Sequence, residues 1–172
     1  MTSGIRRVVT VNDSQGKGEV LFDSPAPNVR VLNDAGLVST LVWVTDQTPV
    51  EFSTGSDQAD REIGIPPPAN GSILRIVDFE PEGPDGLSEE AKAGYAARGA
   101  EVGEARHPGM HKTRSVDYAL VMSGEIDMLM DEGDIHLKAG DVVVQQGTNH
   151  AWANTGTETC RIAFVLIDAE GD

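Results

Sequence analysis

The sequence predicts an all-β fold, a barrel or a sandwich of short strands. Short runs rich in Val, Ile and Leu recur along the chain, and each is bounded by Gly, Pro, Asn or Asp. Runs of this kind are typical of antiparallel sheets joined by tight turns. At 172 residues the chain has the usual size of one domain, so we expect one hydrophobic core and one site.

Ten runs are predicted strands, and two of the connections between them have the composition of tight turns. Residues 131–133 and 138–140 each end in a glycine, which can adopt the positive φ that many hairpin turns need. The last 60 residues are therefore expected to form a β-meander. The predicted strands cover residues 7–11, 19–23, 29–32, 37–45, 72–79, 115–122, 125–130, 134–137, 141–145 and 159–168.

Two stretches interrupt this pattern. Residues 54–71 contain three consecutive prolines and several glycines, which predict a rim loop without ladder hydrogen bonds. Residues 88–98 are the one predicted helix, which Ser88 can cap. This insertion could cover the mouth of a barrel or run over its surface. We divide the single structural domain into N-terminal strands with the rim loop, residues 1–70, and a barrel core, residues 71–172.

The charge of the chain excludes two classes of partner. Its formal net charge is −15 and its sequence pI is about 4.5, so it would repel nucleic-acid phosphates and anionic lipid. The N-terminus has no apolar stretch like that of a secretory signal, and no run approaches the length of a membrane helix. We therefore expect a cytoplasmic protein that binds neither nucleic acid nor membranes.

Four polar side chains share one face of a predicted strand. Alternate side chains of a strand lie on the same face, and this face continues as Ala119 and Val121, so it is expected to point inward. Burying polar groups without partners costs about 1–3 kcal/mol each, so they must bind one another, water, a metal or a ligand. The four residues are His111, Thr113, Ser115 and Asp117.

A second polar segment follows Gln145. His150, Trp152 and Asn154 have the same parity and would share a face if this segment is extended. If it lies beside or opposite the first segment, two histidines and one carboxylate converge. Trp152 could then be either a core residue or a platform for a ligand.

The two segments resemble the paired motifs of the cupin superfamily. In the first motif His111 matches the first histidine, Asp117 stands at the glutamate position, and Gly124 follows after the expected six residues. The second motif is matched by Gly140, Gly147, His150 and Asn154. The resemblance implies an all-β double-stranded β-helix, or jelly-roll (cupin) barrel, with one short helical insertion.

The departures from the motifs bear on metal binding. Thr113 replaces the second histidine, Ala105 the leading glycine and Gln145 the proline, and Asp117 is one methylene shorter than glutamate. What remains is the composition of a two-histidine, one-carboxylate site for one divalent ion, Fe, Mn or Zn. The expected metal ligands and catalytic residues are His111, Asp117 and His150.

This metal site requires a bent chain. A straight strand would hold the backbones of His111 and Asp117 about 20 Å apart, too far to share an ion. The chain must therefore bend between Lys112 and Val116, as the resemblance to metal-bearing cupins also implies.

The resemblance implies a small-molecule enzyme. We expect metal-dependent lyase or isomerase chemistry, a dehydratase or decarboxylase, on a small polar or aromatic metabolite. If the chemistry needs no metal, His150 or His111 is expected to act as a general base whose imidazole is oriented by Asp117. The alternatives are an Fe-dependent dioxygenase and a non-catalytic barrel that binds a small ligand. The expected substrate-binding residues are Thr113, Ser115, Trp152 and Asn154.

The open edges of a small sheet are often covered by a second copy of the chain. We therefore expect a homodimer, with Leu37–Thr45 at or near the interface.

Overall fold

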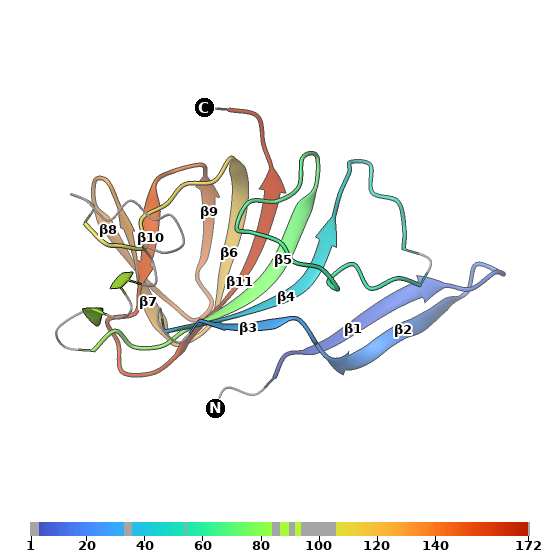
Figure 1. The fold of residues 1–172 in the computed structure, drawn as a ribbon, viewed down its shortest axis with the longest axis horizontal. Coiled ribbons are helices and arrows are strands. Elements are labelled where there is room, and N and C mark those ends of the chain that lie inside the picture. Colours follow the sequence, from blue (N-terminus) through green and yellow to red (C-terminus); the bar gives the residue numbers. More distant parts are fainter. Residues whose placement is uncertain are drawn as a thin grey trace.

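The computed structural model of the chain is an all-β protein (Figure 1). It describes residues 4–32, 36–53, 55–83, 87–89, 92–93 and 106–171. The strands of this described part are β1 (Arg6–Asn12), β2 (Gly18–Pro25), β3 (Val29–Leu32), β4 (Leu37–Thr45), β5 (Ser72–Phe79), β6 (Ser115–Ser123), β7 (Glu125–Met130), β8 (Asp134–Lys138), β9 (Val142–Gln146), β10 (His150–Ala153) and β11 (Cys160–Asp168).

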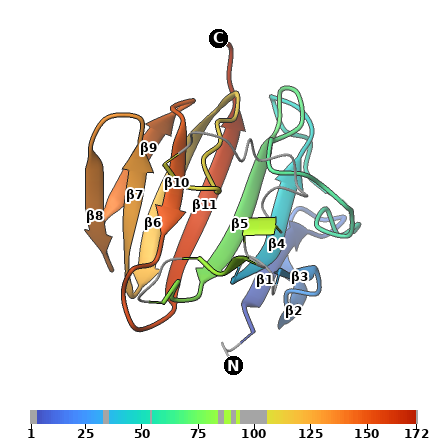
Figure 2. The same cartoon turned by 60° about the vertical axis from the view of Figure 1, so that its left-hand side comes forward.

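The strands form three antiparallel sheets in the described part of the chain. The largest has the order β3-β4-β5-β11-β6-β9, and a smaller sheet has the order β10-β7-β8. Figures 1 and 2 show the small sheet facing the β11, β6 and β9 side of the large one. The β1–β2 hairpin extends from the opposite end of the molecule (Figure 1). This is the expected double-sheet arrangement, and β3 and β4 extend its large sheet. The predicted β-meander is wrong, because from β6 onward only β7 and β8 are both consecutive along the chain and paired.

The core fills the space between the two facing sheets. Strands β6 and β11 alternate buried and less buried residues, so one face of each lies on the core. Met128 and Trp152 of the small sheet belong to the same apolar cluster as Val121 and Ile162 of the large one. The two sheets are therefore halves of one barrel.

Each of the ten predicted strands is present, with ends shifted by at most two residues. Strand β10 was not predicted, although it carries His150 and Trp152. Residues 55–71 contain no strand, as expected for a rim loop. The predicted helix lies largely outside the described residues, and Glu89 and residues 92–93 within it are helical. Within the described part, no helix is long and apolar enough to cross a membrane.

Candidate active site

A cavity of about 1190 Å³ opens between the two sheets. Side chains from both sheets line it, together with parts of the rim loop and the segment before β6. Four of the sequence-predicted site residues line it: His111, Asp117, His150 and Trp152. Its volume is ample for a small metabolite.

The chain crosses from one sheet to the other just before Asp117. His111 forms an isolated antiparallel bridge with His150 of the small sheet, while Ser115 already begins β6 of the large sheet. Residues 112–114 make the crossing and bend at Arg114. The predicted bend between Lys112 and Val116 is confirmed, and it explains how residues of one motif reach both walls of the cavity.

His111 and His150 lie side by side. Their backbones exchange two hydrogen bonds of 2.9 Å, and their ring centroids are 4.6 Å apart. The Nδ1–H of His111 donates to the carbonyl of Gly109 (2.8 Å), and that of His150 donates to the carbonyl of Thr148 (3.0 Å). We assign the proton to Nδ1 in both rings from these contacts. In the neutral form of each ring, this assignment leaves a lone pair on Nε2.

Burial keeps His150 neutral. Desolvation lowers the pKa of His150 from 6.5 to about 4, the hydrogen bond to Thr148 opposes this effect, and the neighbouring His111 adds to it. At neutral pH the ring is an uncharged base with a free Nε2. The imidazole is thus able to accept a proton from a ligand in the cavity.

Asp117 ends a chain of buried hydroxyl groups. The hydroxyl of Thr113 donates to that of Ser115 (2.8 Å), which donates to Oδ1 of Asp117 (2.5 Å). Burial raises the pKa of Asp117, and the Ser115 bond, His111 and Arg75 partly offset that rise. Thr113 and Ser115 are buried, as predicted, but they hold the carboxylate and are not among the residues that line the cavity.

The described residues contain no group of three or more His, Cys, Asp and Glu side chains placed to hold a metal ion. The paired imidazoles have the orientation that metal ligands commonly have, with Nδ1 bonded to a carbonyl and Nε2 free. Asp117 accepts a hydrogen bond from Ser115 and does not complete a three-ligand set with the two histidines. The described donor set therefore falls short of the predicted metal site, and the divalent ion stays a prediction.

The two remaining predicted residues differ in their surroundings. Trp152 lines the cavity and packs edge-on against His150 and Phe164, with ring centroids 5.7 and 5.4 Å away. The amide of Asn154 is used by the backbone: it donates to the carbonyls of Phe79 (2.8 Å) and Glu158 (2.9 Å) and accepts from the amide of Gly156. Asn154 does not line the cavity, so its role in the structure is to fix the loop after β10.

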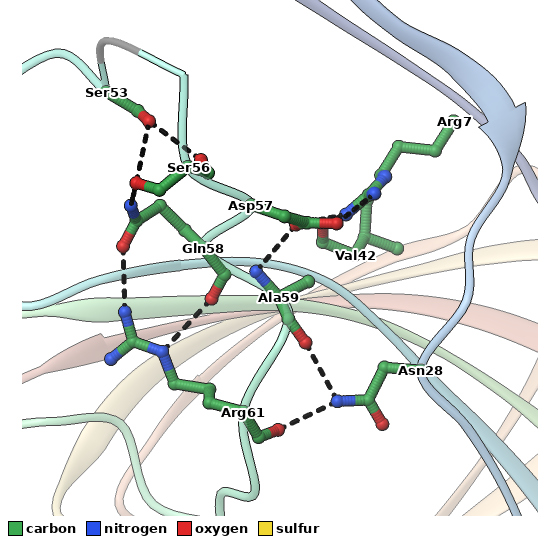
Figure 3. A network of polar contacts seen from close by, with 9 residues as sticks. All are labelled: Arg7, Asn28, Val42, Ser53, Ser56, Asp57, Gln58, Ala59 and Arg61. Carbon is green, nitrogen blue, oxygen red and sulfur yellow. Dashed lines mark hydrogen bonds and ion pairs between the residues drawn. The ribbon is translucent and has the colours of Figure 1, made fainter.

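The rim loop is tied to the barrel by a polar network (Figure 3). Asn28 donates to the carbonyls of Ala59 and Arg61, both at 2.8 Å. The buried Arg7 binds Asp57 with two nitrogens, and this contact lowers the pKa of Asp57. These bonds place the following residues of the loop, including Arg61 and Ile63, on the wall of the cavity.

The sequence analysis missed a group of cationic side chains. Arg30, Arg61, Arg75 and Lys112 all line the cavity. The signal for Arg75 was present in β5, where it has the parity of the buried residues Ile73, Val77 and Phe79. Desolvation and the charge of Arg30 lower the pKa of Arg75 to about 10, so it is a cation at neutral pH.

The comparisons with known proteins identify the family. The Cupin_2 profile, described as a cupin domain, matches residues 97–167. The chain is 36% identical to "Phomopsin biosynthesis cluster protein C'" of Diaporthe leptostromiformis, over 93% of this chain and 77% of that protein. The chain belongs to the cupin superfamily.

Two further proteins are similar to this chain. "Cupin-domain-containing oxidoreductase fogC" of Aspergillus ruber is 30% identical, over 96% of this chain and 75% of that protein. Among solved structures, the cupin domain of Schizosaccharomyces pombe Cnp3 covers 95% of this chain and 87% of its own, with 10% identity and a TM-score of 0.49.

Proposed function

We propose that this cupin is an enzyme that moves protons on a small metabolite, giving isomerase or lyase chemistry. The observation that carries the proposal is the pair of neighbouring imidazoles in a largely apolar cavity, each with Nδ1 bonded to a carbonyl. An imidazole that is uncharged at neutral pH has its Nε2 lone pair available to take a proton from a carbon next to a carbonyl group.

Each residue of the site has a distinct role in the proposed proton transfer. Nε2 of His150 takes the proton from carbon, and the electron pair of the C–H bond passes to the carbonyl oxygen as an enolate. The His150 imidazolium then returns this proton at another atom, which completes an isomerisation. Protonation of a β-hydroxyl group instead releases water, which is a dehydration. Trp152 holds the apolar part of the ligand.

The names of the relatives support a role in small-molecule biosynthesis. Several are described as biosynthesis cluster proteins or as cupin-domain-containing oxidoreductases. The cavity of this chain has the size and the largely apolar lining for a small molecule.

Deuterium exchange tests the proposal. We expect the protein to speed the loss of the α-C–H signal of phenylpyruvate or another enolisable carbonyl compound of a panel in D₂O, followed by proton NMR. His150→Gln should lose at least about 100-fold of this rate, the usual contribution of a general base. The control His136→Gln changes an exposed histidine far from the cavity lining and should keep the rate. Exchange at the buffer rate with every compound would contradict the proposal.

A second candidate is an oxidoreductase, because two relatives are described as cupin-domain-containing oxidoreductases. The form that the sequence analysis anticipated is an iron-dependent dioxygenase. Metal analysis of protein purified without a histidine tag, and oxygen uptake in the presence of Fe(II), separate the two. Stoichiometric iron that is lost in His150→Ala, together with oxygen uptake, would favour the oxidoreductase. Ligand binding without exchange or oxygen uptake would favour the non-catalytic barrel.

A further inference from the structure

The cavity has a charge opposite to that of the whole molecule. The chain carries a net charge of −15, yet the described cavity lining holds four cationic side chains and one carboxylate, that of Asp117. A chain with few cations that gathers them around one apolar cavity creates a local positive potential there. The question is which of these cations have partners within the protein.

Two of the arginines have partners. Arg61 donates to Asp46 (2.8 Å) and to both the carbonyl and the side chain of Gln58. Arg30 has a longer contact with the exposed Glu62 (3.5 Å). These two charges are therefore at least partly compensated.

Arg75 is not compensated in this way. Its Nη2 donates to the carbonyl of Gly64 (2.5 Å), while its Nε–H is buried without a hydrogen-bond partner. Within the described residues, no carboxylate forms an ion pair with it, and Asp117 acts on it only through its field. A half-buried guanidinium with an unpaired N–H is costly unless a further anion pairs with its charge.

The position of Arg75 is central to the wall. In the large sheet it is paired with Leu41 on β4 and with Phe164 on β11, and Phe164 is paired with Ala119 on β6. The side chains around it are apolar: Leu41, Val77, Phe79 and Phe164 line the same cavity. An anion bound here would have its charged end at Arg75 and its body against aliphatic and aromatic side chains.

We propose that the ligand of this cavity is an organic carboxylate with an apolar or aromatic body, and that Arg75 binds the carboxylate. The guanidinium offers planar donors that match the two oxygens of a carboxylate. The inference rests on the proposed function, because it names the class of molecule on which the two histidines act.

The test uses a probe that cannot be turned over by proton transfer at an sp³ carbon, trans-cinnamate, and its neutral amide, cinnamamide. Quenching of tryptophan fluorescence and calorimetry measure both affinities, since Trp152 lies on the cavity wall. We expect cinnamate to bind about 10-fold or more tightly than cinnamamide, the usual effect of a hydrogen-bonded charge. Arg75→Gln should abolish this preference. The control Arg114→Gln, which removes the same charge from an exposed surface position, should keep it.

The two proposals fail in different ways. His150→Gln should lose deuterium exchange and keep the preference for the acid, because it leaves Arg75 intact. Equal binding of acid and amide by the wild type, no binding of either, or an unchanged preference in Arg75→Gln would overturn the inference. The melting temperature of the ligand-free Arg75→Gln variant is a second readout. It should equal or exceed that of the wild type, whereas a clear drop would assign Arg75 a structural role.

Discussion

At the scale of single residues, the burial of His150 affects folding as well as chemistry. The folded pKa of about 4 lies below the ordinary value of 6.5, so between these two values the unfolded chain binds a proton that the folded chain does not. His150 therefore costs stability as the pH falls below 6.5, and the full cost is reached below about pH 4.

This linkage predicts the behaviour of His150→Gln. Between pH 7 and pH 5 the wild type should lose about 2 kcal/mol more of its free energy of unfolding than the variant, measured by urea denaturation. The control His136→Gln should lose stability as the wild type does. The exposed His136 has its pKa raised by Asp127, so its own contribution is lost as the pH rises, the opposite direction. Equal losses in His150→Gln and the wild type would show that His150 is not buried neutral.

Asn154 gives a second prediction at this scale. Asn154→Ala removes three hydrogen bonds to the backbone, one of them buried, so it should lower the free energy of unfolding by about 2–4 kcal/mol. Asn12→Ala, at an exposed position of β1, should stay within about 0.5 kcal/mol of the wild type. Folded Asn154→Ala should retain deuterium exchange. A loss of exchange would show that Asn154 takes part in the active site.

At the scale of elements, the turn between β6 and β7 depends on Gly124. Its φ is +74°, and a Cβ there would lie 2.8 Å from the carbonyl oxygen of Thr159 and 2.9 Å from Cα of Cys160. Both neighbours are backbone atoms at the start of β11, so they cannot move aside cheaply.

Gly124→Ala should therefore destabilise the protein by more than about 3 kcal/mol, the sum of the left-handed strain and the clash. The matched variant Gly133→Ala has a similar φ, +84°, with nothing within 4 Å of the added Cβ. It should cost only the strain, about 1–2 kcal/mol. Thermal unfolding of the two variants checks the difference, and equal losses would show that the contact with β11 is unimportant.

The elements also show why sequence analysis found some features and missed others. Strands β5, β6 and β11 are runs of eight or nine residues rich in apolar side chains, so they stand out in the sequence. Strand β10 was missed because its four residues are all buried and include two alanines, which gives no alternation.

Some residues of the candidate site were also predicted from the sequence, and others were missed or misassigned. The motif spacing located His111 and His150, because the cupin resemblance fixes their places along the chain. Arg75 was overlooked because it stands alone in an apolar run and belongs to no motif. Asn154 was predicted to bind the ligand because it has the parity of His150 and Trp152. Parity gives the direction of a side chain only within a strand, and β10 ends at Ala153.

At the scale of the whole molecule, the large sheet has an apolar outer face. Strand β9 is at its edge, and β6 lies next to it. The exposed side chains that these two strands contribute are Tyr118, Leu120, Met122, Val142 and Val144. A contiguous apolar surface beside an open strand edge is typical of an interface.

We propose that the protein forms a homodimer, and the expectation that Leu37–Thr45 lies at or near the interface stays a prediction. Light scattering at micromolar concentration should give twice the mass of the 18.3 kDa chain. Val144→Glu should shift the protein toward monomer if the apolar face of β6 and β9 contributes, while Val20→Glu on the exposed hairpin strand β2 should not. A monomeric wild type would remove the proposal.

The central claim is that His150 is a neutral base with its proton on Nδ1 and a free Nε2. Long-range proton–nitrogen NMR of uniformly labelled protein reads both the charge and the tautomer of each ring, and only four histidines need to be assigned. At pH 5.5 His150 should be neutral and protonated on Nδ1, while the exposed His136 should be an imidazolium, since Asp127 raises its pKa. A charged His150 at this pH, or a neutral ring with its proton on Nε2, would contradict the account.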